Sequence, residues 1–181
     1  MRSDDARPRV PLPALVLLGI LLLLAPVAFA TGPSDKSAPP PTGPPLAQIV
    51  RDAGCRLTEF EDSMNTNPPV TGDFVERARA ADGSYAGRRP PSLQATLHAM
   101  FHGRVLFQYR PGIADDHLRA LDRLTRQDLD NVLLFENQTG MKAAVAATAY
   151  LSVMTCPRVD ARVLSALDAF RERRRAFGQS F

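Results

Sequence analysis

Hydrophobic and polar positions are distributed unevenly along the chain, and the first pattern is an uncharged apolar segment over residues 10–30. Its length matches the ~20 residues that cross a bilayer as a helix. Arginines precede it and the next basic residue is Lys36, so the positive-inside bias predicts residues 1–9 in the cytoplasm and the remainder outside. This indicates a single-pass cell-membrane protein with an extracytoplasmic C-terminal part. Ala28-Phe29-Ala30 fits a signal-peptidase site, so secretion after cleavage is the alternative.

Residues 31–46 are rich in proline and show no apolar periodicity. Such a segment predicts an extended, unpacked extracytoplasmic linker. From residue 47 onward apolar residues recur at helical or strand spacing, and the remaining length is usual for one domain. We therefore predict a single extracytoplasmic domain over residues 47–181.

Four segments of this domain have the pattern of helices. Ser92 is the predicted N-cap of a helix through His102, and Gly103 is its predicted terminator. The buried face of that helix is predicted from one apolar stripe, formed by Leu93, Leu97, Met100 and Phe101. The other three are a short helix over 47–53, a helix capped by Asp115 or Asp116 with Leu118, Leu121 and Leu124 on one side, and a helix that opens at Asp160, buries Val163, Leu164, Leu167 and Phe170 and closes near Gly178.

Strands are predicted over residues 104–110, 131–136 and 145–154, where β-branched, aromatic or continuous apolar residues dominate. The intervening turn-rich segments 65–72 and 82–91 are predicted to form long ordered loops. These elements define an α+β fold, a small mixed or antiparallel sheet of about three strands packed with three or four helices, behind the N-terminal transmembrane or signal helix. The short connection between the last two strands favours an antiparallel pair there.

Charge changes this picture little. The formal net charge of +3 includes Arg2, Arg7 and Arg9 against Asp4 and Asp5 in the leader, so the folded part carries little excess charge. No nucleic-acid partner is expected on that balance. Four arginines lie near the C-terminus of the last predicted helix, Arg171, Arg173, Arg174 and Arg175. We interpret them as solvated cations that complement the helix dipole, in preference to a contact with anionic lipid or a partner.

The two cysteines, Cys55 and Cys156, bracket nearly the whole folded region. An oxidising compartment outside the cytoplasm allows them to pair, and we predict a disulfide. Two unpaired buried thiols are the alternative. Metal ligation by this pair is less favoured, because neither cysteine has a second cysteine or a histidine at short spacing.

His98 and His102 are the strongest candidates for a metal site. Four residues apart on a predicted helix, they lie on neighbouring turns of one face, which suits joint coordination of a transition metal such as copper. The competing interpretation is that the two histidines cap, pair or face solvent, because an i,i+4 pair alone is a weak motif. Met100, Met141, Met154 and His117 are further metal-ligand types that no spacing selects.

Tyr85 and Tyr109 are candidate ligand-binding residues, since tyrosine offers a flat apolar body with a polar tip. Completion of the core is the competing role for both. No serine lies in a nucleophile elbow and no glycine-rich phosphate loop is present in the sequence, so no catalytic residue is predicted.

A fixed order of motifs runs through the domain: Gly54-Cys55, Asn67-Pro68-Pro69-x-x-Gly72, Gly83-x-Tyr85, His98-Ala99-Met100-x-His102-Gly103-Arg104-Val105, Ala146-Ala147-Thr148-Ala149-Tyr150 and Cys156. Over residues 53–171 this order resembles the domain-of-unknown-function 3105 family of bacterial, largely membrane-anchored proteins. The resemblance implies an extracytoplasmic domain behind one N-terminal span, and it brings no activity with it. The family pattern has a histidine shortly after the Pro-Pro-x-x-Gly turn and reads His-x-x-Glu-His-Gly in the helix. Phe74 and Phe101 stand at those two places here, which puts a shared polar site in doubt.

Two functions follow as hypotheses. The first is a non-enzymatic, membrane-tethered module that binds an envelope protein or a small ligand outside the cytoplasm. The alternative is an extracytoplasmic metal-binding domain that uses His98 and His102, with copper as one candidate ion.

Overall fold

The computed structural model describes residues 43–61 and 65–174. All of them belong to one compact unit, Pro40–Phe181. The predicted leader at 10–30 and residues 31–42 of the predicted linker at 31–46 lie outside the described residues. Within the described ranges, no helix combines the length and apolar character needed to span a bilayer.

Helix α2 (Leu93–Phe101) forms where the sequence predicts it, because both of its ends carry strong signals. The Ser92 side chain accepts a hydrogen bond from the Ala95 amide at 3.3 Å, which caps the N-terminus. At the other end Gly103 adopts a positive φ of 81°, and the Arg104 amide donates to the Ala99 carbonyl at 3.1 Å. This left-handed glycine, with the hydrogen bond that follows it, ends the helix.

Three further helices are α1 (Leu46–Asp52), α3 (Asp115–Gln127) and α4 (Ala161–Arg174). Asp160 caps α4, because its carboxylate accepts from the Val163 amide at 3.0 Å. The predicted cap of α3 is wrong. Ala114 is the N-cap residue, without a side-chain bond, and both aspartates lie in the first turn, where their charge favours the helix dipole. The predicted end of α4 near Gly178 lies outside the described residues.

The sheet has six strands in the described residues, rather than about three, and is mixed in direction. In chain order they are β1 (Arg56–Glu59), β2 (Gly83–Ser84), β3 (Val105–Tyr109), β4 (Val132–Glu136), β5 (Val145–Ala149) and β6 (Ser152–Cys156). The spatial order is β1-β6-β5-β3-β4-β2. β2 and β3 run parallel to β4, whereas the remaining pairs are antiparallel. The predicted pairing of 131–136 with 145–154 is therefore wrong, since β3 lies between β4 and β5.

The predicted strand 145–154 is a hairpin, β5 and β6, that turns at Tyr150 and Leu151. Leu151 takes a positive φ of 56°, a turn conformation in which Gly or Asn is usually found. Hydrogen bonds to residues distant in the sequence hold Leu151 in this conformation instead. The Leu151 amide donates to the Val70 carbonyl at 3.1 Å, and its carbonyl accepts from the Phe60 amide at 3.0 Å.

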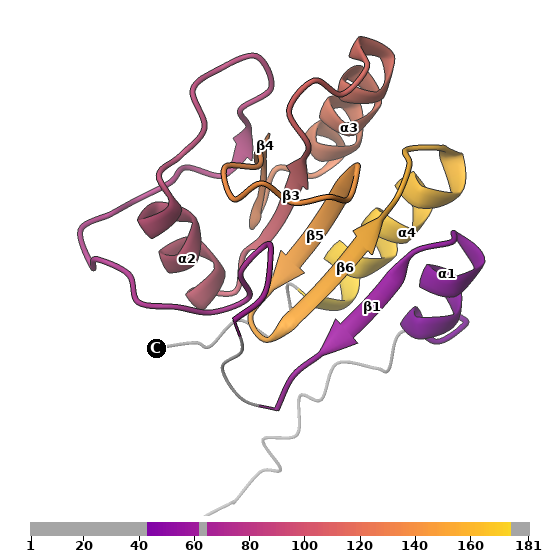
Figure 1. The fold of residues 1–181 in the computed structure, drawn as a ribbon, viewed down its shortest axis with the longest axis horizontal. Coiled ribbons are helices and arrows are strands. Elements are labelled where there is room, and N and C mark those ends of the chain that lie inside the picture. Colours follow the sequence, from indigo (N-terminus) through magenta and orange to yellow (C-terminus); the bar gives the residue numbers. More distant parts are fainter. Residues whose placement is uncertain (1–42, 62–64, 175–181) are drawn as a thin grey trace, which may run out of the picture. The chain divides into compact units, whose positions relative to one another are not determined.

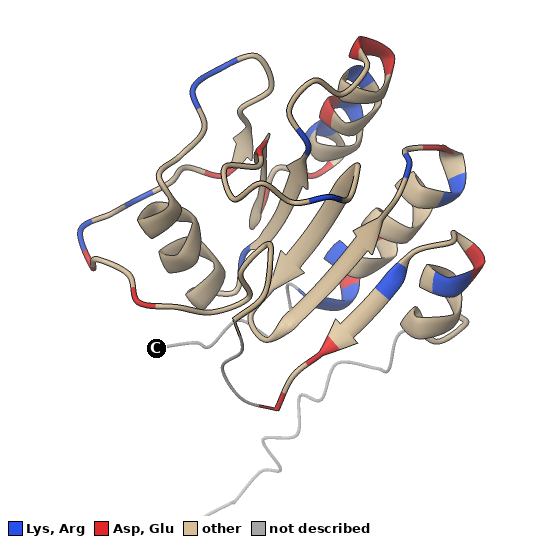
Figure 2. Ribbon diagram, viewed as in Figure 1, with Lys and Arg blue, Asp and Glu red and all other residues tan. Residues whose placement is uncertain are grey.

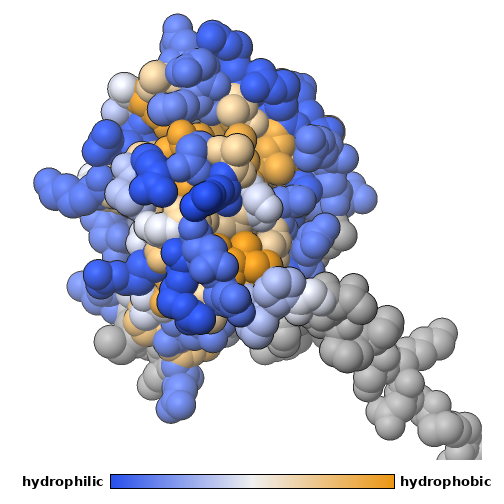
Figure 3. Space-filling model, turned by 90° about the vertical axis from the view of Figure 1, so that its right-hand side faces the viewer, coloured by the Kyte–Doolittle hydropathy of each residue, from blue (hydrophilic) through white to orange (hydrophobic). Residues whose placement is uncertain are grey.

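Alternation along β3 and β4 divides the core between the two faces of the sheet. Val105, Phe107 and Tyr109 belong to the larger cluster, with residues of α1, α3 and α4. Leu106 and Phe135 belong to the smaller cluster, which packs under α2. Figure 1 shows this arrangement, with α2 on one side of the strands and the other three helices on the opposite side. The face that carries those three helices is mostly hydrophilic, with apolar side chains in small groups (Figure 3).

The buried face of α2 differs from the predicted stripe. Leu93 is 44% exposed, whereas Leu97 and Met100 are buried as predicted and His98 is only 3% exposed. His98 is buried because the loop that precedes α2 packs across it, through Phe74 and Arg79. A helical projection considers the residues of α2 alone, so it cannot predict the burial that this loop causes.

A disulfide joins Cys55, just after α1, to Cys156 at the end of β6, as predicted. The bond connects residues 101 positions apart and links the edge strand β1 to its neighbour at one end. Charged residues lie mainly on the helices and loops, and β5 and β6 carry none (Figure 2). The edge strand β1 begins with Arg56 and ends with Glu59, charges that discourage pairing with another chain.

Candidate functional site

The candidate site lies at the C-terminal half of α2, around His98. Its Nδ1 is 2.7 Å from the Ala78 carbonyl oxygen. Because a carbonyl only accepts, Nδ1 carries the proton and donates. In the neutral ring Nε2 is then an acceptor, and the bond to Ala78 fixes the direction in which it points.

Two groups meet this Nε2. Arg79 Nη1 lies at 2.9 Å and donates to it, since a guanidinium has only donors. His102 Nε2 lies at 2.9 Å on the next turn of the helix. The structure therefore brings together the two predicted histidines and adds an arginine that the sequence analysis did not select. Arg79 lies in a loop without a motif, and only the folded chain places it against α2.

These groups surround a small cavity of about 60 Å³. Its lining consists of Ala78, Arg79, Ala80, His98, Ala99, His102 and Arg104. Among these described residues every ionisable side chain is basic. Asp82 stands outside the lining and accepts from Arg104 Nε at 2.6 Å, so it holds that guanidinium in place and offsets part of its charge.

The electropositive setting affects His102. Burial lowers the pKa of His102 below its ordinary value of 6.5, and His98 when it is protonated, Arg104 and Arg79 lower it further. Each of these charges disfavours the imidazolium form. The cavity is thus a place where an added cation is disfavoured and an added anion is favoured.

The two phenylalanines that depart from the family pattern lie in this same cluster. The Phe74 ring stacks on His98, with centroids 4.7 Å apart and planes 9° apart. Phe101 contacts Phe74 at 5.0 Å and His102 at 5.9 Å. The four positions singled out by the resemblance are therefore neighbours in space. Here two of them supply an apolar wall and two supply imidazoles.

The metal hypothesis gains no further ligands from the fold. In the part of the chain that the structure describes, no group of three or more His, Cys, Asp or Glu side chains is arranged to hold a metal ion. Met100 and Met154 are fully enclosed, in the cores on opposite faces of the sheet, and His117 lies on α3. The two histidines remain the ligands that geometry supports.

Tyr85 and Tyr109 do not share a site. Tyr85 packs at the edge of the smaller cluster, donates to the Ala81 carbonyl at 2.9 Å and lies under the Arg88 guanidinium at 5.2 Å. Tyr109 is buried in the larger cluster on the other face. Burial raises the pKa of Tyr109, and the Glu136 carboxylate raises it further. The two rings therefore pack with different core clusters.

A polar network fixes the loop that carries the Asn67-Pro68-Pro69 motif. The Asn67 amide donates to the Thr139 carbonyl at 2.8 Å, and Thr139 Oγ1 donates to Asn67 Oδ1 at 2.6 Å. Buried Asn137 donates to Gln108 at 2.8 Å, and Gln108 in turn donates to Thr148 at 3.1 Å. This chain of bonds anchors the loop on the sheet before it runs on to Phe74.

These features define a class, an α+β domain with a basic cavity between a helix and its preceding loop. The profile of the family described as protein of unknown function (DUF3105) matches residues 61–176, and the chain belongs to this family. The match begins after Cys55. No curated protein and no solved structure matches the chain.

Proposed function

We propose that the protein is a membrane-tethered extracytoplasmic module that binds an anionic group in the cavity between Arg79, His98, His102 and Arg104, without a chemical step. One observation carries this proposal: two imidazoles and two guanidiniums surround one cavity whose lining contains no acidic residue. The cavity is of the size of one carboxylate or phosphate group. Such a group belongs to a small ligand or to a side chain of an envelope protein.

Bond geometry supports the same proposal. Guanidinium and imidazolium groups form short, charge-assisted hydrogen bonds to carboxylate and phosphate oxygens, and arginine suits planar oxyanions best. An anion in the cavity accepts from Arg79 and Arg104 and favours a protonated His102. The repulsion between the basic groups in the empty site is thereby relieved.

Location outside the cytoplasm is part of the proposal. The apolar segment 10–30 supports export, and the Cys55–Cys156 disulfide supports it as well, because structural disulfides persist in oxidising compartments. A reporter fused after Phe181 is expected to be active only outside the cytoplasm. Activity restricted to the cytosol argues against export.

A metal site is the second candidate, and the separation of the two imidazoles favours it. Nitrogens about 2.0–2.1 Å from one ion at adjacent corners of a square lie about 2.9 Å apart. The His98 and His102 Nε2 atoms are 2.9 Å apart, which suits the tetragonal geometry of Cu(II). Against it stands the Arg79 guanidinium, 2.9 Å from the same nitrogen.

Substitution of Arg79 separates the two candidates. We expect the full-length chain to bind inorganic phosphate or acetate in calorimetric titration, and Arg79→Ala to weaken that binding about tenfold, because a charge-assisted hydrogen bond is lost. Cu(II) binding, if present, responds in the opposite sense, since removal of a cation from His98 favours a metal. Arg77→Ala is the matched control, an exposed arginine of the same loop. Absence of saturable anion binding, together with stoichiometric copper that His98→Ala abolishes, assigns the site to a metal instead.

Anion binding is expected to strengthen as the pH falls. The pKa of His102 lies below 6.5 in the empty site, and a bound anion raises it. Affinity therefore increases as the pH falls through the pKa of His102 in the complex, and it levels off below the pKa of His102 in the free site. Stability changes in the opposite sense, because a depressed folded pKa contributes stability that is present above 6.5 and lost below it. An NMR titration of the imidazole signals, with and without phosphate, measures both pKa values. A His102→Gln variant that keeps the full pH dependence contradicts this assignment.

A further inference from the structure

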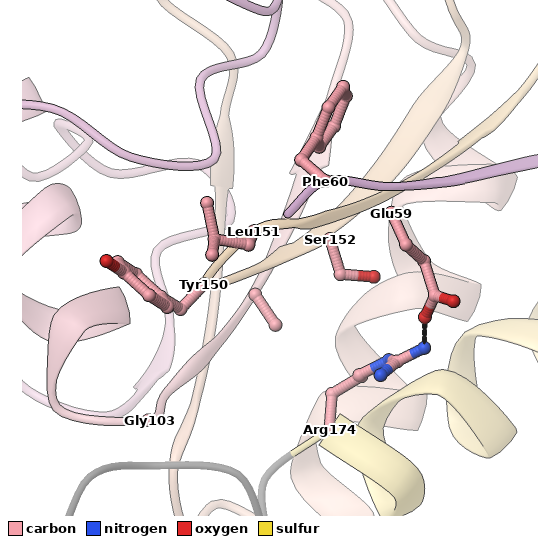
Figure 4. A pocket seen from close by; sticks show the side chains of 8 residues that line it. Glu59, Phe60, Gly103, Tyr150, Leu151, Ser152 and Arg174 are labelled. Atoms are coloured by element: carbon pink, nitrogen blue, oxygen red, sulfur yellow. Dashed lines mark ion pairs between the residues drawn. The ribbon is translucent and has the colours of Figure 1, made fainter. Parts of the chain in front are cut away.

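A second concave site lies near the C-terminal end of α2 and shares no lining residue with the basic cavity. It is an open pocket of about 330 Å³, within the range of small-ligand sites. Its lining comes from four places in the fold: Glu59 and Phe60 at the end of β1, Gly103 after α2, Ala149 to Ser152 at the β5–β6 turn, and Arg174 of α4. Figure 4 shows these side chains around the pocket.

Ser152 carries the clearest sign of a ligand. The residue is only 3% exposed, and its hydroxyl oxygen has no hydrogen-bond partner among the described residues. In Figure 4 its side chain points toward Glu59 and Arg174. A buried hydroxyl without a partner costs free energy, and a polar group in the pocket removes that cost.

The charged lining is a balanced pair. Arg174 forms an ion pair with Glu59, and its guanidinium also lies 5.9 Å from the centre of the Phe170 ring. The Glu59 side chain is 55% exposed and that of Arg174 is 21% exposed, so the pair faces the opening. One positive and one negative group, held side by side, complement a ligand that carries both charges at a similar separation.

We propose that this pocket binds a free α-amino acid with an apolar side chain. The carboxylate and the ammonium of an α-amino acid are attached to one carbon, so both reach the Glu59–Arg174 pair without breaking it. The carboxylate meets the arginine, the ammonium meets the glutamate, and Ser152 bonds to either group. Leu151, Ala149 and the Tyr150 ring, which is partly exposed, provide apolar surface for the side chain.

The test is a titration of the full-length chain with L-leucine, followed by calorimetry. We expect saturable one-to-one binding. L-Leucinamide lacks the carboxylate and N-acetyl-L-leucine lacks the ammonium, and each is expected to bind at least about tenfold more weakly. Glu59→Gln is expected to weaken leucine binding at least about fivefold. Arg173→Gln, at the same helix end but outside the pocket lining, is the matched control and leaves it unchanged.

Ser152→Ala distinguishes a role of the hydroxyl in ligand binding from a role in stability. It removes a buried hydroxyl without a partner, so the thermal midpoint is expected to stay the same or rise while leucine affinity falls at least about fivefold. No saturable binding of leucine, or equal binding of leucine and its two analogues, overturns the proposal. Inorganic phosphate is expected not to compete with leucine, which separates this site from the basic cavity.

Discussion

Reduction of the Cys55–Cys156 disulfide is expected to lower the free energy of unfolding by several kcal/mol. The bond closes a loop with a sequence separation of 101 residues. In the chain-entropy account, a cross-link over about 100 residues stabilises the fold by up to about 4.7 kcal/mol, mainly by restricting the unfolded chain. Whole domains are stable by only about 5–15 kcal/mol, so this is a large fraction. Urea unfolding with and without a thiol reductant measures the difference.

The cysteine side chains themselves must be separated from the cross-link. Cys156 is fully buried in the larger core cluster, so its replacement also removes packing. Reduced wild-type protein keeps both sulfurs and isolates the effect of the bond. A Cys55→Ala, Cys156→Ala chain is then expected to lie at or slightly below the reduced protein in stability. Equal urea midpoints for the oxidised and reduced proteins are inconsistent with the entropic role.

The ends of α2 and the disulfide were predictable because a few residues determine each of them, without reference to the rest of the fold. Ser92 and Gly103 are the residues that a helix start and stop require, and both act within a few residues of themselves. Two cysteines leave only one possible intramolecular pairing. The same locality accounts for β3 and β4, whose apolar content marks them as strands.

The size of the sheet was not predictable from such patterns. β2 contains two residues, Gly83 and Ser84, and exists because β4 provides a parallel partner for them. The β5–β6 turn has Tyr150 and Leu151 instead of the expected turn residues, and bonds to Val70 and Phe60 hold it. Both features depend on segments far away in the sequence, which a short window does not contain.

The candidate site was likewise predictable only in part. The helical spacing of His98 and His102 predicts that they are neighbours, and their Nε2 atoms are 2.9 Å apart. The chemistry of this histidine pair depends on Ala78 and Arg79, which contact His98 from a loop about twenty residues earlier. Without the loop the pair suggests a metal. With it, the cavity is basic and an anion becomes the better-supported ligand.

The arginines of α4 illustrate the largest difference between pattern and structure. The sequence pattern predicts Arg171 as a solvated cation, yet the residue is 5% exposed. Its Nη1 donates to the Leu124 carbonyl at 3.2 Å and to the Asp128 carbonyl at 3.3 Å, and Nη2 pairs with Asp168. The side chain therefore caps the C-terminus of α3. Arg173 donates to the Pro44 carbonyl at 2.6 Å. The solvated interpretation is wrong for Arg171, because α3 ends against it.

Arg171→Met is accordingly expected to destabilise the domain by about 2 kcal/mol, since it removes the guanidinium that bonds to the Leu124 and Asp128 carbonyls. Methionine keeps much of the length and apolar packing of the side chain, so the loss reports the capping bonds. Arg173→Met is the matched control two residues along, and a change within about 1 kcal/mol is expected for a substitution nearer the surface. Urea unfolding of the two variants beside the wild type measures both values. Equal losses for the two substitutions mean that the guanidinium of Arg171 contributes only what any helix-terminal cation contributes, and that the cap of α3 lies elsewhere.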